Sequence, residues 1–375
     1  MKNITKLLLI TIVIVGSTLV FTKYCNCFNN NISLVNKNIK FDLKYKGLKN
    51  AVDFTSDGKG NYYIAYKDKI QLIAITGKSN YIYNGPGLNI KSLEYKNNEL
   101  YFSSGTKILC YNLISKKTST IIKDLPNFGD YKDSIIRING DNVYVTIGAA
   151  TNSGVVGDDN LWLKDSKYTC DIPPFDITLK GLNFGSENNS AFSIYGTKGI
   201  KGQIISGHFP GNSSILMYNL KSKRLNTYGY GIRNIKGMDF NSQGMIIASV
   251  GGMENRGMRP VKGDCDYIYK IEEGVWYGWP DYSGGDPVTS PRFKGGNNQS
   301  LSFVFENHPT TNPPAPIYQH KSLNTLSQIA VDKYGNVETK DSTFFYDIGS
   351  KTVFNIDTYG IINEVLSLNS GSINS

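Results

Sequence analysis

Val52-Asp53-Phe54, a turn, and Gly60-Asn61-Tyr62-Tyr63 form the first copy of a pattern that recurs along this 375-residue chain. The further copies are Met238-Asp239-Phe240 with Gly244-Met245-Ile246, and Val331-Asp332 with Gly335-Asn336-Val337. Turn-and-strand units without the leading Asp stand at Asn98–Tyr101 and Asp141–Tyr144. Short apolar or aromatic runs separated by Gly and Asn turns are typical of β-hairpins. The pattern therefore predicts an all-β domain over residues 46–368.

The spacing of the pattern predicts the architecture. The second strands begin near residues 62, 101, 144, 246 and 337, so the intervals are roughly 40 residues at first and roughly 100 and 90 later. We interpret each long interval as two periods. A period of about 40 to 50 residues with four short strands is typical of a propeller blade. This predicts a six-bladed β-propeller; a sandwich gives no reason for the repeat, and the period is too long for a β-helix.

Two long irregular segments interrupt the pattern, at residues 148–210 and 250–320. They are rich in Gly, Pro, Asn and Asp, and so read as loops rather than strands. In a propeller, long loops gather at one end of the central channel. Because functional residues concentrate on loops held by a rigid scaffold, we expect the site there.

The N-terminus predicts export. Lys2 and Lys6 precede an apolar stretch from Leu7 to Phe21, which is shorter than the roughly 20 residues of a spanning helix and suits a signal peptide. We predict one N-terminal hydrophobic helix, with residues 1–23 as signal peptide or membrane anchor, 24–45 as spacer and 369–375 as tail. The body is then extracytoplasmic, at the cell membrane, or secreted if the segment is cleaved.

Composition narrows the partners. Lys plus Arg is 40 against 31 Asp plus Glu, a net charge of +9 without any basic run, so we predict no nucleic-acid partner. An anionic envelope polymer, a membrane surface or an acidic cofactor suits this charge. Five cysteines are too few for a disulfide scaffold. Cys110, Cys170 and Cys265 are buried thiols or contain at most one disulfide.

The segment from Gly231 to Phe293 is the most unusual part of the chain. It gathers arginines, carboxylates and two tryptophans in loops. Arg grips carboxylates or sugar oxygens in pairs, and aromatic rings give flat faces for stacking. Together they indicate a pocket for a planar or cyclic polar ligand, shaped by Trp276, Tyr277 and Trp279. The alternative is that Arg and Asp pair to brace the loops while Trp packs between blades.

This segment resembles the glucose/sorbosone dehydrogenase family, particularly its sorbosone dehydrogenase-like branch. The matching motifs are Arg233-Asn234 with Gly237, Arg256-Gly257-Met258-Arg259-Pro260, Asp266, Trp276-Tyr277-Gly278-Trp279-Pro280, Asp171-Ile172-Pro173 with Asp176–Leu179, and Tyr195-Gly196-Thr197 with Gly202-Gln203. The similarity covers residues 46–362 and is dense from 170 to 293. It implies a six-bladed propeller that oxidises sugars or sugar aldehydes with pyrroloquinoline quinone (PQQ) in the central channel and calcium beside it.

The resemblance assigns residues to this site. Arg233 and Asn234 match the family's Arg-Asn over substrate and quinone, so Arg233 would orient the substrate. Lys351 falls near the basic turn that grips the quinone carboxylates. The further residues implied are Tyr277 and Trp279 at the cofactor, and Gly252 and Met253 as backbone ligands of calcium, a cation that accepts carbonyl oxygens.

The family's base is replaced. Family dehydrogenases carry an Asp-His pair shortly before a strand that ends in a Thr-Ile-Gly-like turn; here the strand is Val143–Gly148 and the pair is Asp130-Tyr131. Tyr titrates near ~10 when unperturbed, and is a poor base at neutral pH unless a cation lowers its pKa. The candidate bases are therefore Asp130 and His320.

Two functions follow as hypotheses. The first is a membrane-tethered extracytoplasmic oxidoreductase, a sugar or sugar-aldehyde dehydrogenase of glucose/sorbosone type that uses PQQ and passes electrons to an unidentified acceptor. The second is a non-catalytic propeller that binds an envelope carbohydrate or a protein. The replaced base and the single Lys351 favour the second, and the shared motifs favour the first.

Overall fold

The computed structural model describes residues 32–36, 39–40, 44–45, 47–186 and 188–368. The helices of this part are two 3-10 turns, η1 (Leu161–Lys164) and η2 (Gly296–Asn298). A membrane-spanning helix of sufficient length and apolarity is not found in the described ranges. The predicted segment 1–23 and tail 369–375 lie outside the described residues, as does part of the 24–45 spacer, so these assignments stay predictions.

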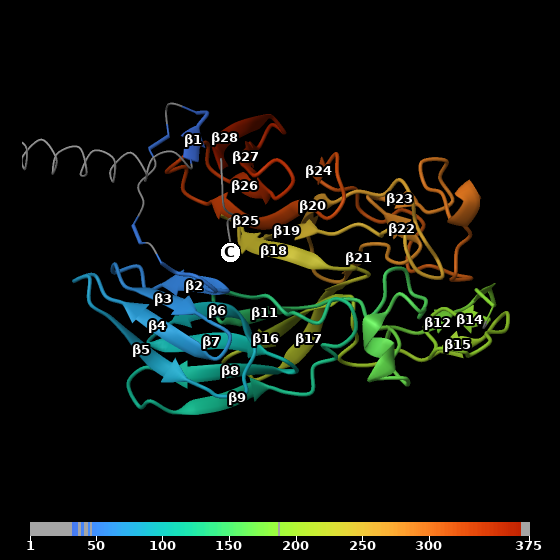
Figure 1. Ribbon diagram of the computed structural model, residues 1–375, viewed down its shortest axis with the longest axis horizontal. Coiled ribbons are helices and arrows are strands. Elements are labelled where there is room, and N and C mark those ends of the chain that lie inside the picture. Colours follow the sequence, from blue (N-terminus) through green and yellow to red (C-terminus); the bar gives the residue numbers. More distant parts are fainter. Residues whose placement is uncertain (1–31, 37–38, 41–43, 46, 187, 369–375) are drawn as a thin grey trace, which may run out of the picture.

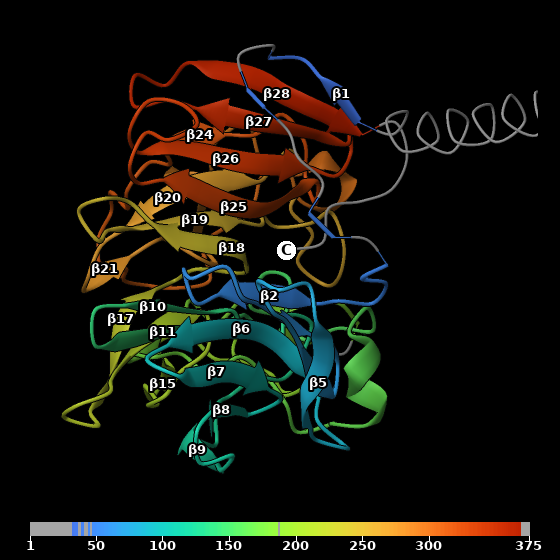
Figure 2. The ribbon, with the colours of Figure 1, turned by 90° about the vertical axis from the view of Figure 1, so that its left-hand side faces the viewer.

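Five sheets form the body, and their strands pair antiparallel except where β21 joins β17 in parallel (Figures 1 and 2). Blade 1 holds β2 (Asp53–Ser56), β3 (Tyr62–Ala65), β4 (Lys69–Ile73) and β5 (Ser79–Asn84). Blade 2 holds β6 (Ile90–Lys96), β7 (Glu99–Ser104), β8 (Lys107–Asn112) and β9 (Thr118–Ile122). Blade 3 holds β10 (Ile136–Asn139), β11 (Asn142–Ile147), β16 (Ser214–Asn219), β17 (Leu225–Tyr230) and β21 (Val275–Trp276).

The last two blades complete the body. Blade 4 holds β18 (Ile235–Phe240), β19 (Ile246–Val250), β20 (Tyr267–Ile271) and β24 (Tyr318–Gln319). Blade 5 holds β25 (Leu326–Asp332), β26 (Ser342–Asp347), β27 (Thr352–Ile356) and β28 (Ile362–Leu368), with β1 (Ile32–Leu34) on its outer edge. The all-β propeller predicted from the repeat is confirmed.

The predicted number of six blades is wrong, because the described residues form five. β11 and β16 are neighbours in one sheet, with Asn142 opposite Asn219, so the segment between them is an insertion within blade 3. β20 likewise pairs with β24 across a second insertion. Each long interval in the sequence therefore holds one period and an insertion rather than two periods.

The insertions build a lobe beside the blades, seen on the right of Figure 1. It consists of three two-stranded pairs: β12 (Ile177–Thr178) with β15 (Ile204–Ile205), β13 (Asn183–Phe184) with β14 (Asn189–Ser190), and β22 (Tyr282–Ser283) with β23 (Asp286–Pro287). Their apolar residues share one core cluster, which includes Phe192, Trp279 and Phe305. The lobe thus has a core of its own, distinct from the cores between blades.

The blades pack face to face around the inner strands β2, β6, β10, β18 and β25. Four apolar clusters join blade 1 to 2, 2 to 3, 3 to 4 and 4 to 5, and in the described residues none joins blade 5 to blade 1. β1 instead ties the N-terminal side of the chain to the last blade, with Ile32 opposite Leu368. In Figure 2 blade 5 lies above blades 1 and 2.

Candidate functional site

The first cavity lies where the five inner strands begin and has a volume of about 610 Å³. Its lining includes Val52 before β2, Lys91 in β6, Ile135 before β10, Ile235 in β18 and Ser327 in β25. A cleft of ~300–1,000 Å³ is the usual size of a small-molecule site. The cavity is therefore the mouth of the central channel, large enough for a cofactor or a sugar.

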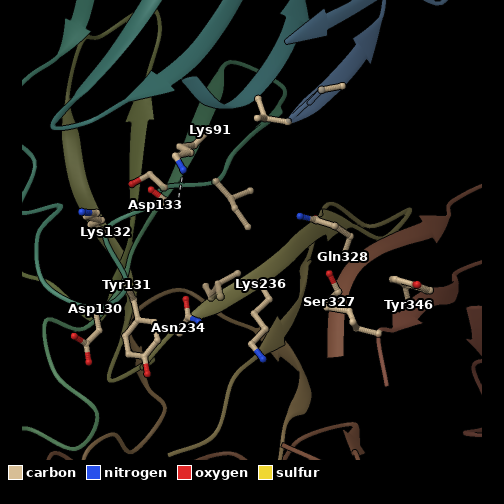
Figure 3. A pocket seen from close by; sticks show the side chains of 16 residues that line it. Lys91, Asp130, Tyr131, Lys132, Asp133, Asn234, Lys236, Ser327, Gln328 and Tyr346 are labelled. Carbon is tan, nitrogen blue, oxygen red and sulfur yellow. Dashed lines mark ion pairs between the residues drawn. The ribbon is translucent and has the colours of Figure 1, made fainter. Parts of the chain in front are cut away.

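Three lysines line this cavity: Lys91, Lys132 and Lys236 (Figure 3). Lys91 pairs with Asp133 at 2.9 Å, and Lys132 is exposed. Lys236 Nζ lies 3.1 Å from the buried Asp266 carboxylate. Burial lowers the pKa of Lys236, and the neighbouring Asp266 opposes that effect. The lining therefore offers more ammonium groups than carboxylates to an anionic ligand.

Asp266 holds Lys236 in place. Its carboxylate accepts from the amides of Thr325 and Leu326 at 3.0 and 2.9 Å, and from the amide of Gly252 at 3.3 Å. These contacts connect blade 4 to the start of β25. A lysine anchored to a fully buried, multiply bonded carboxylate projects from a fixed point, which suits a binding residue.

Arg233 lies behind the cavity wall rather than in it, and is 2% exposed. It donates to the carbonyl and side-chain oxygens of Asn152 at 3.0 and 2.9 Å and to Glu254 at 2.8 Å. Its guanidinium carbon stacks 4.3 Å from the ring centre of Tyr131, to whose hydroxyl it also donates. Its neighbour Asn234 is among the residues that line the first cavity, whereas Arg233 is not.

Arg256 links the same network to Asp130. It contacts Asp130 at 2.7 Å, Asp159 at 2.5 Å and Glu254 at 2.6 Å. Asp130 also accepts from Trp162 at 2.8 Å and from Asn160 at 3.1 Å. The Asp130 carboxylate lines the cavity, but its oxygens already accept from these donors. It therefore has little acceptor capacity left for the predicted role as a base.

Tyr131 sits between these charges. Its hydroxyl donates to Glu254 at 2.9 Å and accepts from Arg256 at 3.0 Å. Burial raises the pKa of Tyr131 to about 12. The nearby Arg233 and Arg256 would lower this pKa, but Glu254 offsets their effect. Burial favours a higher pKa for Glu254 as well, but the neighbouring Arg233 and Arg256 lower its pKa to about 2. Tyr131 therefore stays a neutral phenol at physiological pH.

The other predicted base is buried elsewhere. His320 is 2% exposed and bonds Tyr318 and Thr325, each at 3.0 Å. Burial lowers its pKa, opposed by the nearby Asp347. The lining of the first cavity does not include it. Lys351 is exposed on the β26–β27 turn, three positions after Ile348, which does line the cavity.

The predicted aromatic residues lie in cores. The Tyr277 hydroxyl donates to the carbonyl of Lys270 at 2.9 Å, and Tyr277 packs between blades 3 and 4. Trp279 Nε1 donates to the carbonyl of Asn152 at 3.1 Å inside the lobe core. Both side chains face the small void behind Arg233 rather than the first cavity. In this part of the site the alternative interpretation of the sequence applies: Arg233 pairs with a carboxylate, and the aromatic side chains pack in cores.

The predicted calcium ligands are partly consistent with that role. The amides of Gly252 and Met253 are fixed by Asp266 and Asp264, at 3.3 and 2.6 Å. Their carbonyl oxygens accept no hydrogen bond within the described ranges. Backbone carbonyls are among the oxygen donors that calcium takes, and these two would be part of its shell of about six to eight. No cluster of three acidic, His or Cys metal ligands occurs among the residues the structure describes.

Sequence reasoning missed Lys91, Lys132, Asp133 and Lys236. A lysine or aspartate beside a strand reads as a solvated surface residue, and nothing in its own neighbourhood marks it. The available signal is positional: these residues flank the starts of inner strands, as Arg233-Asn234 does before β18.

Cys110, Cys170 and Cys265 are free thiols, as the first of the two alternatives predicted; Cys110 and Cys265 are buried and Cys170 is half-buried.

Comparison with solved structures finds the same fold in sugar-oxidising proteins. The holo PQQ domain of a pyranose dehydrogenase from Coprinopsis cinerea matches with a TM-score of 0.59 and 11% identity, covering 92% of this chain and 90% of that one. A calcium structure of a family AA12 carbohydrate-active enzyme from Trichoderma reesei matches with a TM-score of 0.58 and 12% identity, covering 92% and 88%.

A third similar structure is the PQQ-bound aldose sugar dehydrogenase from Streptomyces coelicolor, with a TM-score of 0.51 and 13% identity, covering 89% of this chain and 84% of that one. No protein-family model matches the sequence, and comparison with curated protein sequences finds no match. Two of these three neighbours are sugar dehydrogenases described with PQQ, as the sequence resemblance implied. At these identities the likeness shows the fold.

Proposed function

We propose that this protein is an oxidoreductase that binds PQQ in the first cavity and oxidises sugars or sugar aldehydes. The observation that carries the proposal is a lysine-lined cavity of about 610 Å³ at the channel mouth of a propeller. The fold likeness to PQQ-bound sugar dehydrogenases supports it.

The lining suits this cofactor. PQQ is planar and carries three carboxylates, so it needs cations around a flat slot. Lys91, Lys132 and Lys236 supply the cations, and Asn234 supplies an amide. Charge-assisted contacts of this kind are the strong ones. Calcium would bind the carbonyls of Gly252 and Met253, whose amides are already anchored and which lie outside the lining of the first cavity, Met253 at the small void behind Arg233.

When bound, PQQ supplies the hydride acceptor, and the chain must take the proton of the substrate hydroxyl. We assign this role to Asp133. Its side chain is 54% exposed and pairs with Lys91 alone in the described structure, whereas Asp130 is 13% exposed and held by Arg256, Asn160 and Trp162. A base needs a free acceptor within reach of the substrate.

The tether belongs to the same proposal. We place the propeller outside the cytoplasm, joined to the membrane by residues 1–23 unless these are cleaved. Lys2 and Lys6 before the apolar stretch support this orientation. A membrane position would put the reduced cofactor close to a membrane electron acceptor.

A dye-reduction assay tests the activity. Purified protein is incubated with PQQ and calcium, and aldoses and sugar aldehydes are then offered with an artificial electron acceptor. The proposal expects turnover that needs both the quinone and the sugar. If quinone binds and no sugar is oxidised, the protein is a binding module.

That second candidate rests on a specific observation. Tyr131 stands where the family has its base, and its pKa of about 12 removes it from proton transfer at neutral pH. A propeller that binds an envelope carbohydrate or a protein would need no base. A glycan array with the quinone-free protein distinguishes it: saturable glycan binding without dye reduction supports this candidate.

A further inference from the structure

A second cavity, of about 410 Å³, follows the same inner strands further along the channel. Its lining includes Phe54 in β2, Glu94 in β6, Asp239 in β18 and Ala330 in β25, which lie after the residues that line the first cavity. Tyr346 lines both cavities. The volume is in the range of small-molecule sites, and the proposed function makes no use of it.

The charges on this lining do not balance. Three carboxylates face two cations: Asp53, Glu94 and Asp239 against Arg137 and Lys333. Lys333 pairs with Asp239 at 2.9 Å. Arg137 is shared, at 3.4 Å from Asp53 and 3.4 Å from Glu94. One carboxylate is therefore in excess.

Glu94 carries that excess. Asp53 also accepts from the Ser92 hydroxyl and the Leu93 amide, both at 2.8 Å, so its charge is well satisfied. Burial raises the pKa of Glu94 to about 7, although Arg137 opposes this effect. A cation that entered the cavity would restore the missing charge and favour the ionised carboxylate.

Tyr346, which lines both cavities, has a buried hydrogen-bonding group without a partner among the described residues. Tyr346 is 3% exposed, and its hydroxyl has no hydrogen-bond partner in the described part of the chain. Buried hydroxyls normally have a partner, so this one points to a ligand or water. Aromatic side chains at Phe54, Phe240 and Phe344 complete the lining. A cation already lies near one of them, since Lys333 Nζ is 5.8 Å from the Phe240 ring centre.

We propose that the second cavity binds a small organic ammonium ion with an apolar body. The ammonium group pairs with Glu94 and hydrogen-bonds the Tyr346 hydroxyl. The body packs on the Phe54 and Phe344 rings, where cation and aromatic faces also attract each other. Neutral ligands of the same shape lack the ion pair and bind more weakly.

Calorimetry on the quinone-free protein tests this with 2-phenylethylammonium as the probe and 2-phenylethanol as its neutral counterpart. We expect the amine to bind at least tenfold more tightly than the alcohol at pH 8. Glu94→Gln should weaken amine binding at least tenfold. Glu364→Gln at an exposed position of β28 and Lys236→Ala in the first cavity should leave amine binding unchanged.

The pH dependence is a second readout that needs no variant. The groups facing Glu94 are Asp53, Arg137, Asp239 and Lys333. Because Glu94 ionises with a pKa of about 7 and the amine stays charged, affinity should rise up to about tenfold from pH 6 to pH 8. Equal binding of amine and alcohol, no amine binding at millimolar concentration, a flat pH profile or dependence on Lys236 would each overturn the proposal. PQQ binding is measured separately, so the two proposals fail independently.

Discussion

Single residues explain why the site departs from the family pattern. The resemblance implied that Arg233 lies over the substrate. Its guanidinium instead donates hydrogen bonds to Asn152, Glu254 and Tyr131, behind the wall of the first cavity. Asn234, one position on, does line the cavity. The resemblance to the family located this turn in the sequence. Whether Arg233 or Asn234 faces the channel depends on the strand register, which the motif does not contain.

The residue-scale prediction concerns Asp133. Asp133→Asn keeps the shape and removes the basic carboxylate, so sugar oxidation should fall by about 100-fold, the usual contribution of a general base, while PQQ binding stays within about twofold. Steady-state dye reduction and quinone titration measure the two effects. Asp165→Asn, exposed after η1, is the matched control. An unchanged rate in Asp133→Asn would remove the assigned base.

At the scale of elements, the repeat visible in the sequence is a turn. Asp57, Asn241 and Asp332 each accept from an amide four positions ahead, at 3.1, 2.9 and 2.9 Å. The first two copies are therefore centred on Asp57 and Asn241 rather than on Asp53 and Asp239. Local hydrogen bonding fixes such turns, which is why sequence alone revealed the hairpins. The insertions have no comparable local signal, since pairing across them is non-local.

The insertion in blade 3 is closed by a buried carboxylate. Asp171 is 2% exposed and accepts from the amide of Ala150 at 2.6 Å, the hydroxyl of Thr151 at 2.5 Å and the amide group of Asn212 at 3.0 Å. Burial raises its pKa to about 6. The folded state therefore binds a proton more tightly than the unfolded chain does.

A pH-dependent stability follows from this shift. Protonation of Asp171 contributes to the free energy of unfolding, and this contribution is fully present below the unfolded pKa near ~4. It is lost as pH rises to about 6, which lowers the free energy of unfolding by about 2–3 kcal/mol. Asp171→Asn should make this slope shallower in urea unfolding between pH 4 and 6.5, leaving the part that comes from Glu94, whose pKa is raised as well; the exposed Asp124→Asn should leave the slope unchanged. An unchanged slope in Asp171→Asn would show that Asp171 does not contribute to it.

The whole molecule is held by contacts between inner strands. Asp53 at the start of β2 binds Ser92 and Leu93 of β6 and the Arg137 guanidinium of β10, so it joins three blades. Asp239 similarly accepts from the Val331 amide of blade 5 at 2.8 Å. The period predicted this architecture, but the number of blades was overestimated, since insertion and blade have similar lengths.

Removing the Asp53 carboxylate should therefore destabilise the whole propeller. Asp53→Ala leaves the buried Leu93 amide without its acceptor and removes one of the two carboxylates beside Arg137, at a cost of about 1–3 kcal/mol in the free energy of unfolding. Urea unfolding measures the change. Asp57→Asn, four residues further on at the exposed turn, retains an acceptor and should unfold like the wild type. Equal stability of Asp53→Ala and the wild type would contradict the role given to this residue.

Isothermal titration of PQQ into the protein in the presence of calcium tests the central claim most directly. We predict one site per chain with micromolar or tighter affinity. Lys236→Ala removes one charge-assisted contact and should weaken binding about tenfold or more, whereas Lys117→Ala, exposed on the outer edge of blade 2, should not. Absence of binding at micromolar concentration, or equal affinity of Lys236→Ala and the wild type, would contradict a quinone site in the first cavity.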